Sequence, residues 1–527
     1  MPNSWNHTLE HVERTSILET GSGPIMSSSI SSYSGSASTG SVDAMFVLEW
    51  GSDASHICHS PRRPTQCTRP SFAARGTHLR FLSQHSQGDQ EARHDYFMHK
   101  ASLSASISSL TNTIIGSGLL ALPSAFATMG WFLGSFFILF CAATTLFGLV
   151  LVKLSCDKID KKASGFYDLM FRINPYKMWI IDLVIGVKCY GVTISYLIIG
   201  GTLMPQVVLS VSNSLGISSA QVPNILINKY FWYMVVVSCM IPICSVRHLK
   251  SLSMVGYLNM MAVAYIVAIM TYFSLAPDSW HLLPMPGPVV AVKWGKEALR
   301  TFPIILFAYT CSQNIIPVYN ELYNSTLERT SIVTFTSVLS CAFVYLFVGL
   351  VGYFSFGAHV GNNVMAMYPD KGLFVGLGKL CVVLLAITSY PMQLYPSRAS
   401  LLSLSRSWSY KPTIRTNEDG TEVVPLLPEE SHSVVDSMSS LWFYGVTLAE
   451  ILSGVLIALL IDDLSIVLGF VGALGSTTIS FIVPAYVYCM LHANDTTHWL
   501  YRASLALGVY GVVVLLLAFG ANVYKLL

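Results

Sequence analysis

From Leu103 onward, the chain is a succession of apolar runs of roughly 18 to 25 residues, the length that an α-helix needs to cross a bilayer. Lipid offers no water to satisfy a backbone N–H or C=O group, so a run of this kind must fold as a helix. The chain is also 53% hydrophobic and only 11% charged, which is more apolar surface than a water-soluble fold can bury. We therefore expect an all-α integral membrane protein.

The apolar runs predict about eleven transmembrane helices. A polar segment, 403–440, separates the eighth from the ninth, and we expect it to be a flexible loop. The ninth and tenth are the least clearly separated, because only Asp462 and Asp463 interrupt the apolar sequence between them. The expected spans are 103–126, 131–153, 178–211, 230–246, 252–275, 298–320, 330–354, 373–402, 441–461, 464–490 and 500–524.

The first hundred residues differ from the rest of the chain. They contain no long apolar run, and the segment 26–41 is rich in Ser and Gly, a composition that does not support a packed core. The first residues also lack the basic and apolar regions of a signal peptide. We expect a disordered N-terminal tail over 1–100, followed by a transmembrane domain over 101–527.

The distribution of basic residues predicts the orientation in the membrane. With the N-terminus in the cytosol, the inward loops hold fourteen Lys and Arg and the outward loops hold seven, as the positive-inside rule requires. This orientation places Glu422, Leu426 and Leu427 in a cytosolic loop, where EVVPLL has the form of an acidic dileucine sorting signal, although six-residue matches also arise by chance. The net charge of +2 gives no indication of nucleic-acid binding.

The first expected span carries three small residues at mid-membrane, Gly116, Ser117 and Gly118, in the sequence NTIIGSGLLALP. In a discontinuous helix, such residues free backbone N–H groups that suit a carboxylate and C=O groups that suit a cation. The alternative is that small residues simply allow neighbouring helices to pack closely.

The sixth expected span, FPIILFAYTCSQN from Phe302, is too polar at its centre for a helix that faces lipid. It would begin the second half of a five-plus-five arrangement of helices. Interruptions at corresponding positions of two halves indicate the central site of a transporter. A polar strip that faces neighbouring helices is the alternative.

These segments resemble the amino acid/auxin permease family over residues 100–524. The resemblance is closest to fungal-type vacuolar amino-acid exporters and extends to the sodium-coupled neutral amino-acid transporters. It implies the LeuT-like fold, a five-plus-five inverted repeat with one extra helix. The matching segments are TNTIIGSGLLALP, IGVKCYGVTISYLIIGGTLMPQ, FAYTCSQNIIPVYNEL, SYPMQLYPSR and IDDLSIVLGFVGALGSTTISFIVPA.

The resemblance implies a substrate site between the first and sixth spans. The main chain around Gly116, Ser117 and Gly118 would hold the substrate carboxylate. Four residues of the sixth span would meet the amino group and side chain: Phe307, Ala308, Tyr309 and Thr310.

The resemblance also implies a position for a coupling ion. In the sodium-coupled relatives, the corresponding site would use carbonyls near Asn112 and Ile115 together with the hydroxyls of Thr388 and Ser389. The alternative is that the two hydroxyls bond back to their own helix, as Ser and Thr commonly do.

Lys188 lies midway along the third span, where a lysine costs about 2.5 to 3.5 kcal/mol on insertion scales. The resemblance implies a role in transport, either in place of a missing cation or in contact with an acidic substrate. The alternative is a structural pairing with a carbonyl or with Glu450 of the ninth span. Exporters of this type commonly carry His at the position of Ser312 and Asp at that of Thr202, so Lys188 is the first candidate for a proton carrier.

The leading hypothesis is therefore a secondary transporter that exports amino acids from a vacuole or lysosome and is driven by protons. The alternatives are a sodium-coupled importer of the same fold and an amino-acid sensor that signals through the tail. The expected partners are an amino acid, a proton or sodium ion, and the lipid bilayer. We expect no enzymatic activity, cofactor or metal, because no nucleophile triad, metal cluster or phosphate loop is present.

Overall fold

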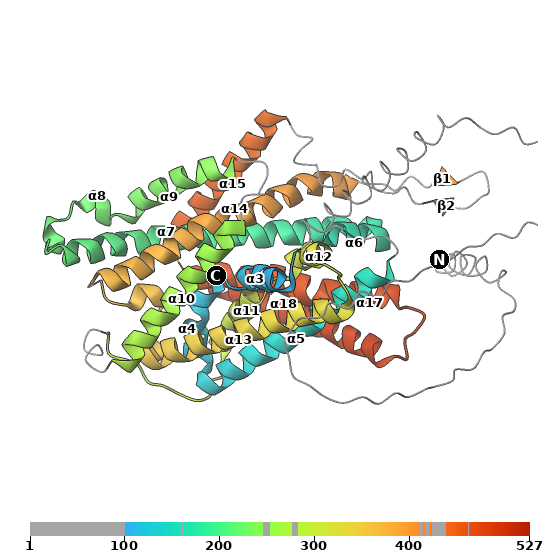
Figure 1. The fold of residues 1–527 in the computed structure, drawn as a ribbon, viewed down its shortest axis with the longest axis horizontal. Helices are drawn as coiled ribbons and strands as arrows, with labels where there is room; N and C mark the ends of the chain where they lie inside the picture. The colour runs from blue at the N-terminus through green and yellow to red at the C-terminus, as the bar shows by residue number, and fades with distance from the viewer. Residues whose placement is uncertain are drawn as a thin grey trace, which may run out of the picture. The chain divides into compact units, whose positions relative to one another are not determined.

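The computed structural model describes residues 101–159, 163, 165–245, 253–276, 283–370, 372–409, 415–416, 422–423, 439–461 and 463–526. These residues are almost entirely helical (Figure 1). The α-helices are α3 (Leu103–Ile114), α4 (Gly118–Met129), α5 (Trp131–Lys158), α6 (Phe166–Ile173), α7 (Met178–Ser214), α8 (Asn224–Ile227), α9 (Lys229–Cys244), α10 (Ser253–Leu275), α11 (Lys296–Ala308), α12 (Ser312–Glu321), α13 (Leu327–Phe356), α14 (Leu373–Ser409), α15 (Ser440–Leu460), α16 (Leu464–Phe470), α17 (Val483–Leu491) and α18 (Trp499–Leu526).

Short elements complete the described part of the chain. Four 3-10 turns lie in the connections: η1 (Pro175–Lys177), η2 (Ser219–Gln221), η4 (Gly357–His359) and η5 (Val364–Met367). Two-residue strands β1 (Arg415–Thr416) and β2 (Glu422–Val423) pair in antiparallel fashion. Between α16 and α17 the helix widens into two π-helical segments, η7 (Val471–Ser476) and η8 (Thr478–Ile482).

The helices confirm an all-α membrane protein. Within the described residues, nine helical spans are long and apolar enough to cross a membrane, and the bent pair α3–α4 makes a tenth. The predicted fourth span corresponds to α9, an apolar helix of 16 residues that is shorter than the others. The count of eleven, like the inverted repeat, remains a prediction.

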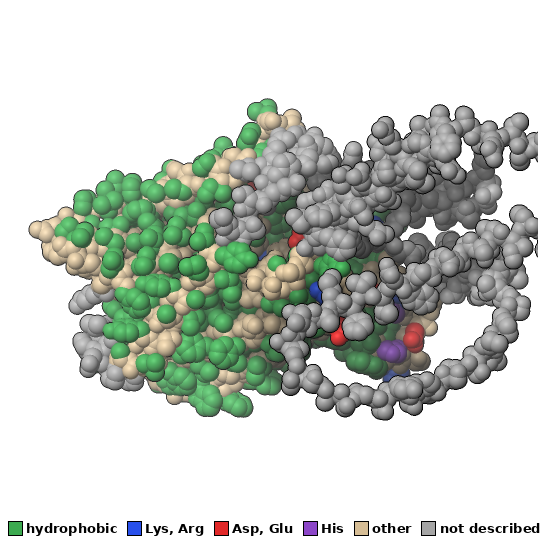
Figure 2. Space-filling model, in the orientation of Figure 1, with side chains coloured by type: hydrophobic (Ala, Val, Ile, Leu, Met, Phe, Trp, Pro, Cys, Tyr) green, Lys and Arg blue, Asp and Glu red, His purple; other side chains and the backbone are tan. Residues whose placement is uncertain are grey.

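The surface of the described helices is suited to lipid. Figure 2 shows hydrophobic side chains over most of the face in view, with the visible charged side chains at one end. Exposed residues on α13 and α18 include Phe343, Leu516 and Leu517, all more than half exposed. Such a surface would be unstable in water, so it agrees with a bundle surrounded by lipid.

The interior of the bundle is formed by three polar or interrupted spans. Of the most apolar 18 residues in each span, 83% are buried in the α11–α12 span and 78% in the α16–α17 span. In α18 the corresponding share is only 28%. The third span, α7, packs extensively against α14 and also contacts η7. The helices with the most polar centres are therefore the ones that the bundle hides from lipid.

Several predicted features lie partly or wholly outside the described residues. The tail 1–100 is outside them, as are Leu426 and Leu427 of the predicted sorting signal, while the backbone of Glu422 belongs to β2. The predicted loop 403–440 begins later than expected, because α14 continues as a helix to Ser409. The domain boundary and the flexibility of the loop remain predictions.

Candidate functional site

Both predicted interruptions are present as breaks in the helices. The first span ends as α3 at Ile114 and begins again as α4 at Gly118, and the two parts are bent by 54°. The sixth span ends as α11 at Ala308 and begins again as α12 at Ser312. Each break exposes the last carbonyl groups of one half-helix and the first N–H groups of the next, because these have no partner within the helix.

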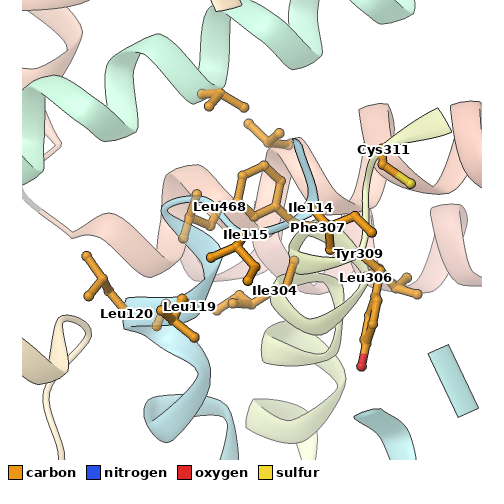
Figure 3. Close-up of a cluster of buried hydrophobic side chains, with 14 of the residues drawn as sticks. Ile114, Ile115, Leu119, Leu120, Ile304, Leu306, Phe307, Tyr309, Cys311 and Leu468 are labelled. Atoms are coloured by element: carbon orange, nitrogen blue, oxygen red, sulfur yellow. The ribbon is translucent and has the colours of Figure 1, made fainter. Parts of the chain in front are cut away.

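The two breaks are in direct contact. A Cβ atom at Gly118 would lie 3.0 Å from Ala308 Cα and 3.2 Å from Phe307 Cδ1, so any larger residue would push the two breaks apart. In Figure 3, Phe307 extends from α11 towards the α3–α4 break, whereas Tyr309 points away from it. The structure therefore brings Gly118, Phe307 and Ala308 together, whereas the side chain of Tyr309 lies away from this contact.

The other predicted substrate residues have partners of their own. Ser117 Oγ lies 3.2 Å from Ser195 Oγ of α7, and both side chains are buried. A Cβ atom at Gly116 would lie 3.6 Å from the hydroxyl of Tyr196, the next residue of α7. The Thr310 hydroxyl donates to Leu306 O at 3.1 Å, within its own span. The third span thus forms a polar wall opposite the first break.

The hydroxyls predicted to bind an ion are linked to an amide on α10. Asn259 Nδ2 donates to Ser389 Oγ at 3.1 Å, and Thr388 Oγ1 donates to Asn259 Oδ1 at 3.1 Å. Thr388 Oγ1 also lies 2.9 Å from Leu384 O of its own helix, which is the back-bonding expected as the alternative. Asn112, on α3, faces α10, since its Nδ2 would lie 3.4 Å from a Cβ at Gly256.

Lys188 is buried in the bundle, with 2% of its surface exposed. Its Nζ donates to Gln393 Oε1 of α14 at 3.4 Å. The predicted alternative of a pairing with Glu450 is wrong, because Glu450 accepts a hydrogen bond from Ser397 Oγ at 3.2 Å and no described carboxylate lies within salt-bridge distance of Lys188. The other predicted alternative, a carbonyl partner, agrees with the contact to the amide carbonyl oxygen of Gln393. A neutral amide is a weak partner for an ammonium, so the charge of Lys188 is poorly compensated.

Sequence reasoning missed several polar residues that line this region. Ser195, Tyr196, Asn259, Tyr345 and Gln393 each hydrogen-bond or face a predicted site residue. Each is a polar side chain in an apolar span, and polar residues inside the membrane are costly enough to indicate function. The presence of these polar residues could be read from the sequence, but the sequence does not show which helix each side chain faces.

The match to known proteins agrees with this geometry. The model of the transmembrane amino acid transporter protein family matches residues 99–527, which covers the described bundle with both breaks. The chain belongs to this family. Within the described residues, no group of three or more His, Cys, Asp and Glu side chains is arranged to hold a metal ion.

Individual relatives of the family carry more specific names. Vacuolar amino acid transporter 5 of Schizosaccharomyces pombe is 30% identical over 444 residues, which cover 82% of this chain and 97% of the relative. Vacuolar amino acid transporter 5 of Saccharomyces cerevisiae is 28% identical, over 79% of this chain and 96% of the relative. Sodium-coupled neutral amino acid transporter 7 of Danio rerio is 23% identical, over 77% and 82%. The fungal relatives and the membrane-spanning helices support a multi-pass protein of the vacuolar membrane.

Proposed function

We propose that this chain is a secondary active transporter that moves amino acids from the vacuolar or lysosomal lumen to the cytosol and is driven by protons. The observation that carries the proposal is the contact between the two helix breaks at Gly118 and Ala308. Unwound main chain at membrane depth is tolerated where it lines a cavity, and paired breaks in two halves are typical of a transporter's central site.

The helix ends at the breaks are suited to a zwitterionic substrate. The N-termini of α4 and α12 carry partial positive charge and free N–H groups, which favour a carboxylate near Gly116, Ser117 and Gly118. The C-termini of α3 and α11 carry the opposite partial charge, which favours an ammonium group. Phe307 and Ala308 offer an apolar surface to the substrate side chain, and Tyr309 and Thr310 contribute main-chain groups.

We assign the coupling role to Lys188. An ammonium group on α7 can stand in for a bound cation, and a lysine can bind and release a proton where sodium would bind and dissociate. Support comes from its burial and from Gln393, a neutral partner that does not fix the charge. Sodium coupling, as in the name of the Danio rerio relative, would place an ion at the hydroxyls of Thr388 and Ser389, which are hydrogen-bonded to Asn259.

The orientation with a cytosolic N-terminus and the sorting role of Glu422, Leu426 and Leu427 belong to the same proposal. Both rest on the sequence: the excess of basic residues on one side and the form of the EVVPLL segment. The vacuolar names of the fungal relatives support the same destination.

Counter-flow in proteoliposomes tests the function. The purified chain is reconstituted with each of a panel of unlabelled amino acids inside, and entry of the labelled amino acid is followed. We expect exchange of some amino acids, with net flux that follows an imposed pH gradient and is indifferent to sodium. Absence of exchange with every amino acid would reject a transporter and favour a sensor, and flux driven by sodium alone would favour the importer.

A further inference from the structure

Tyr345 of α13 lies where the two broken spans converge. Its side chain is fully buried, and its hydroxyl oxygen lies 2.8 Å from Ile114 O and 2.7 Å from Ala308 O. Ile114 is the last residue of α3, and Ala308 is the last residue of α11. One side chain therefore contacts the terminal carbonyl of a half-helix from each of the two breaks.

The position between these two carbonyls is electrostatically unusual. Each half-helix C-terminus carries about half a negative charge, and its last carbonyls lack a partner within the helix. A phenol has one proton to donate, so the Tyr345 hydroxyl can donate a hydrogen bond to only one of the two carbonyl groups at a time. Converging carbonyls of half-helix C-termini are also the groups that hold small cations in broken-helix transporters.

The rest of α13 shows that Tyr345 differs from its neighbours on the same helix face. Ser337 Oγ donates to Ile107 O at 3.1 Å, and Cys341 Sγ lies 3.9 Å from Thr111 O. These contacts recur every four residues along α13, so one face of α13 follows α3. Ile107 lies inside α3, where the carbonyl also accepts a backbone hydrogen bond, whereas the carbonyl at the helix end needs Tyr345.

The ring of Tyr345 is held in place by a second tyrosine. Its centroid lies 5.1 Å from that of Tyr309, with the rings at 76°, an edge-to-face arrangement. The hydroxyl of Tyr309 is buried and has no hydrogen-bond partner among the described residues, so this ring contributes packing at the break. The Tyr345 hydroxyl is thereby directed at the two carbonyls.

We infer that Tyr345 is a positioning residue for transport, whose hydroxyl occupies the place of a small monovalent cation between the two half-helix C-termini and holds both breaks to α13. The inference rests on the proposed function, because the breaks are taken to be the substrate site. It explains how the two converging carbonyl ends are held together at this point.

Two substitutions separate the hydroxyl from the ring. Tyr345→Phe keeps the ring and removes the proton donor, so it should lower the transport rate about tenfold or more. Tyr345→Ser opens space beside Ile114 O and Ala308 O, so sodium should enter and restore part of the rate, whereas choline should not. The matched controls are Ser337→Ala, on the same helix face, and Tyr353→Phe, the same chemical change on the same helix, where the hydroxyl accepts from Val290 N at 3.1 Å.

The melting temperature of each purified variant gives a second measurement that does not depend on transport. A ligand that binds the folded state raises the melting temperature, so sodium should stabilise Tyr345→Ser but neither Tyr345→Phe nor the controls. Transport by Tyr345→Phe at the wild-type rate, or indifference of Tyr345→Ser to sodium in both assays, would overturn the inference. A wild-type chain that moves no amino acid would instead overturn the proposed function, and the melting experiment would still show whether the Tyr345 hydroxyl occupies the place of a small cation.

Discussion

Enlarging Gly118 should separate the two breaks and stop transport. A Cβ atom at this position would lie 3.0 Å from Ala308 Cα, 3.1 Å from Ala308 Cβ and 3.2 Å from Phe307 Cδ1. Two of these three atoms cannot rotate away, because one belongs to the backbone and the other is bonded directly to it. The start of α4 must therefore move away from α11 by several tenths of an ångström for alanine, and farther for valine.

The size of the effect follows from the cost of overpacking. Extra methyl groups in a well-packed interior cost about 1 to 3 kcal/mol. If that cost falls on the conformation in which the breaks touch, the transport rate should fall about 5- to 150-fold. Gly118→Ala should lie near the lower end of this range, and Gly118→Val should lie near or beyond the upper end.

Two glycine substitutions serve as comparisons. Gly445→Val adds the same side chain to α15, where a Cβ atom would meet nothing within 4 Å, and it should transport normally. Gly116→Ala lies in the same break, but its Cβ would be an ordinary 3.6 Å from the Tyr196 hydroxyl. We expect it to keep the maximal rate and to raise KM for bulky amino acids, because the added methyl group occupies the proposed site.

The assay measures initial flux in proteoliposomes, normalised to the amount of correctly inserted protein. Elution as a single monodisperse peak in detergent shows that each variant is folded. The reasoning is refuted if Gly118→Val is folded and transports at the wild-type rate, since the contact between the breaks would then be irrelevant to transport.

Three further predictions address other parts of the molecule. Lys188→Met keeps the approximate bulk of the side chain and deletes its charge. The flux of amino acids should then stop responding to a pH gradient. Normal pH-driven flux in this variant would reject Lys188 as the coupling group. Changing Leu426 and Leu427 to Ala should move the protein towards the cell surface in fluorescence microscopy, whereas an unchanged organelle pattern would remove the sorting signal from the proposal. Arg398 is 2% exposed, its guanidinium lies 4.0 Å from the centroid of the Phe443 ring, and its Nη1 donates to Thr447 Oγ1 at 2.7 Å. Replacing Arg398 with Met should lower the free energy of unfolding by about 2 kcal/mol, because both contacts are lost. Thermal unfolding at the temperature of the exposed control Arg502→Met would contradict this expectation.

The sequence predicted the helices well because the bilayer imposes their length. Each expected span corresponds to a helix or to a broken pair of helices, and the boundaries of α5 and α10 agree at one end to within a residue. The break at Gly116 to Gly118 was also predictable, since small residues at mid-membrane are either a packing surface or an interruption. The structure shows that both are true, because Gly118 is the point where the broken span packs against α11.

Contacts between spans were not predictable from one sequence. Lys188 and Glu450 are two buried charges of opposite sign, yet they belong to separate clusters: Lys188 bonds to Gln393, and Glu450 bonds to Ser397. Asn259 lies opposite Ser389 because of the way α10 is rotated about its own axis. The sequence of α10 does not predict this rotation, because the helix has too few polar residues to distinguish a polar face from an apolar one.

The π-helical segment η7 contacts both Lys188 and α11, the half-helix that precedes the second break. Gly475 of η7 packs against the Cβ and Cγ atoms of Lys188, and Gly472, one turn earlier, packs against the main-chain oxygen of Pro303 in α11. A Cβ atom at Gly475 would overlap Lys188, and one at Gly472 would overlap Pro303, so η7 packs closely against both α7 and α11. A π-helical turn is a rare local geometry that is common at functional sites. Under the role proposed for Lys188, a change of η7 from π-helix to α-helix would move Gly472 relative to α11, the helix that carries Phe307 and Ala308. Coupling through η7 thus requires two arrangements of this one segment, rather than a chain of small displacements across the bundle.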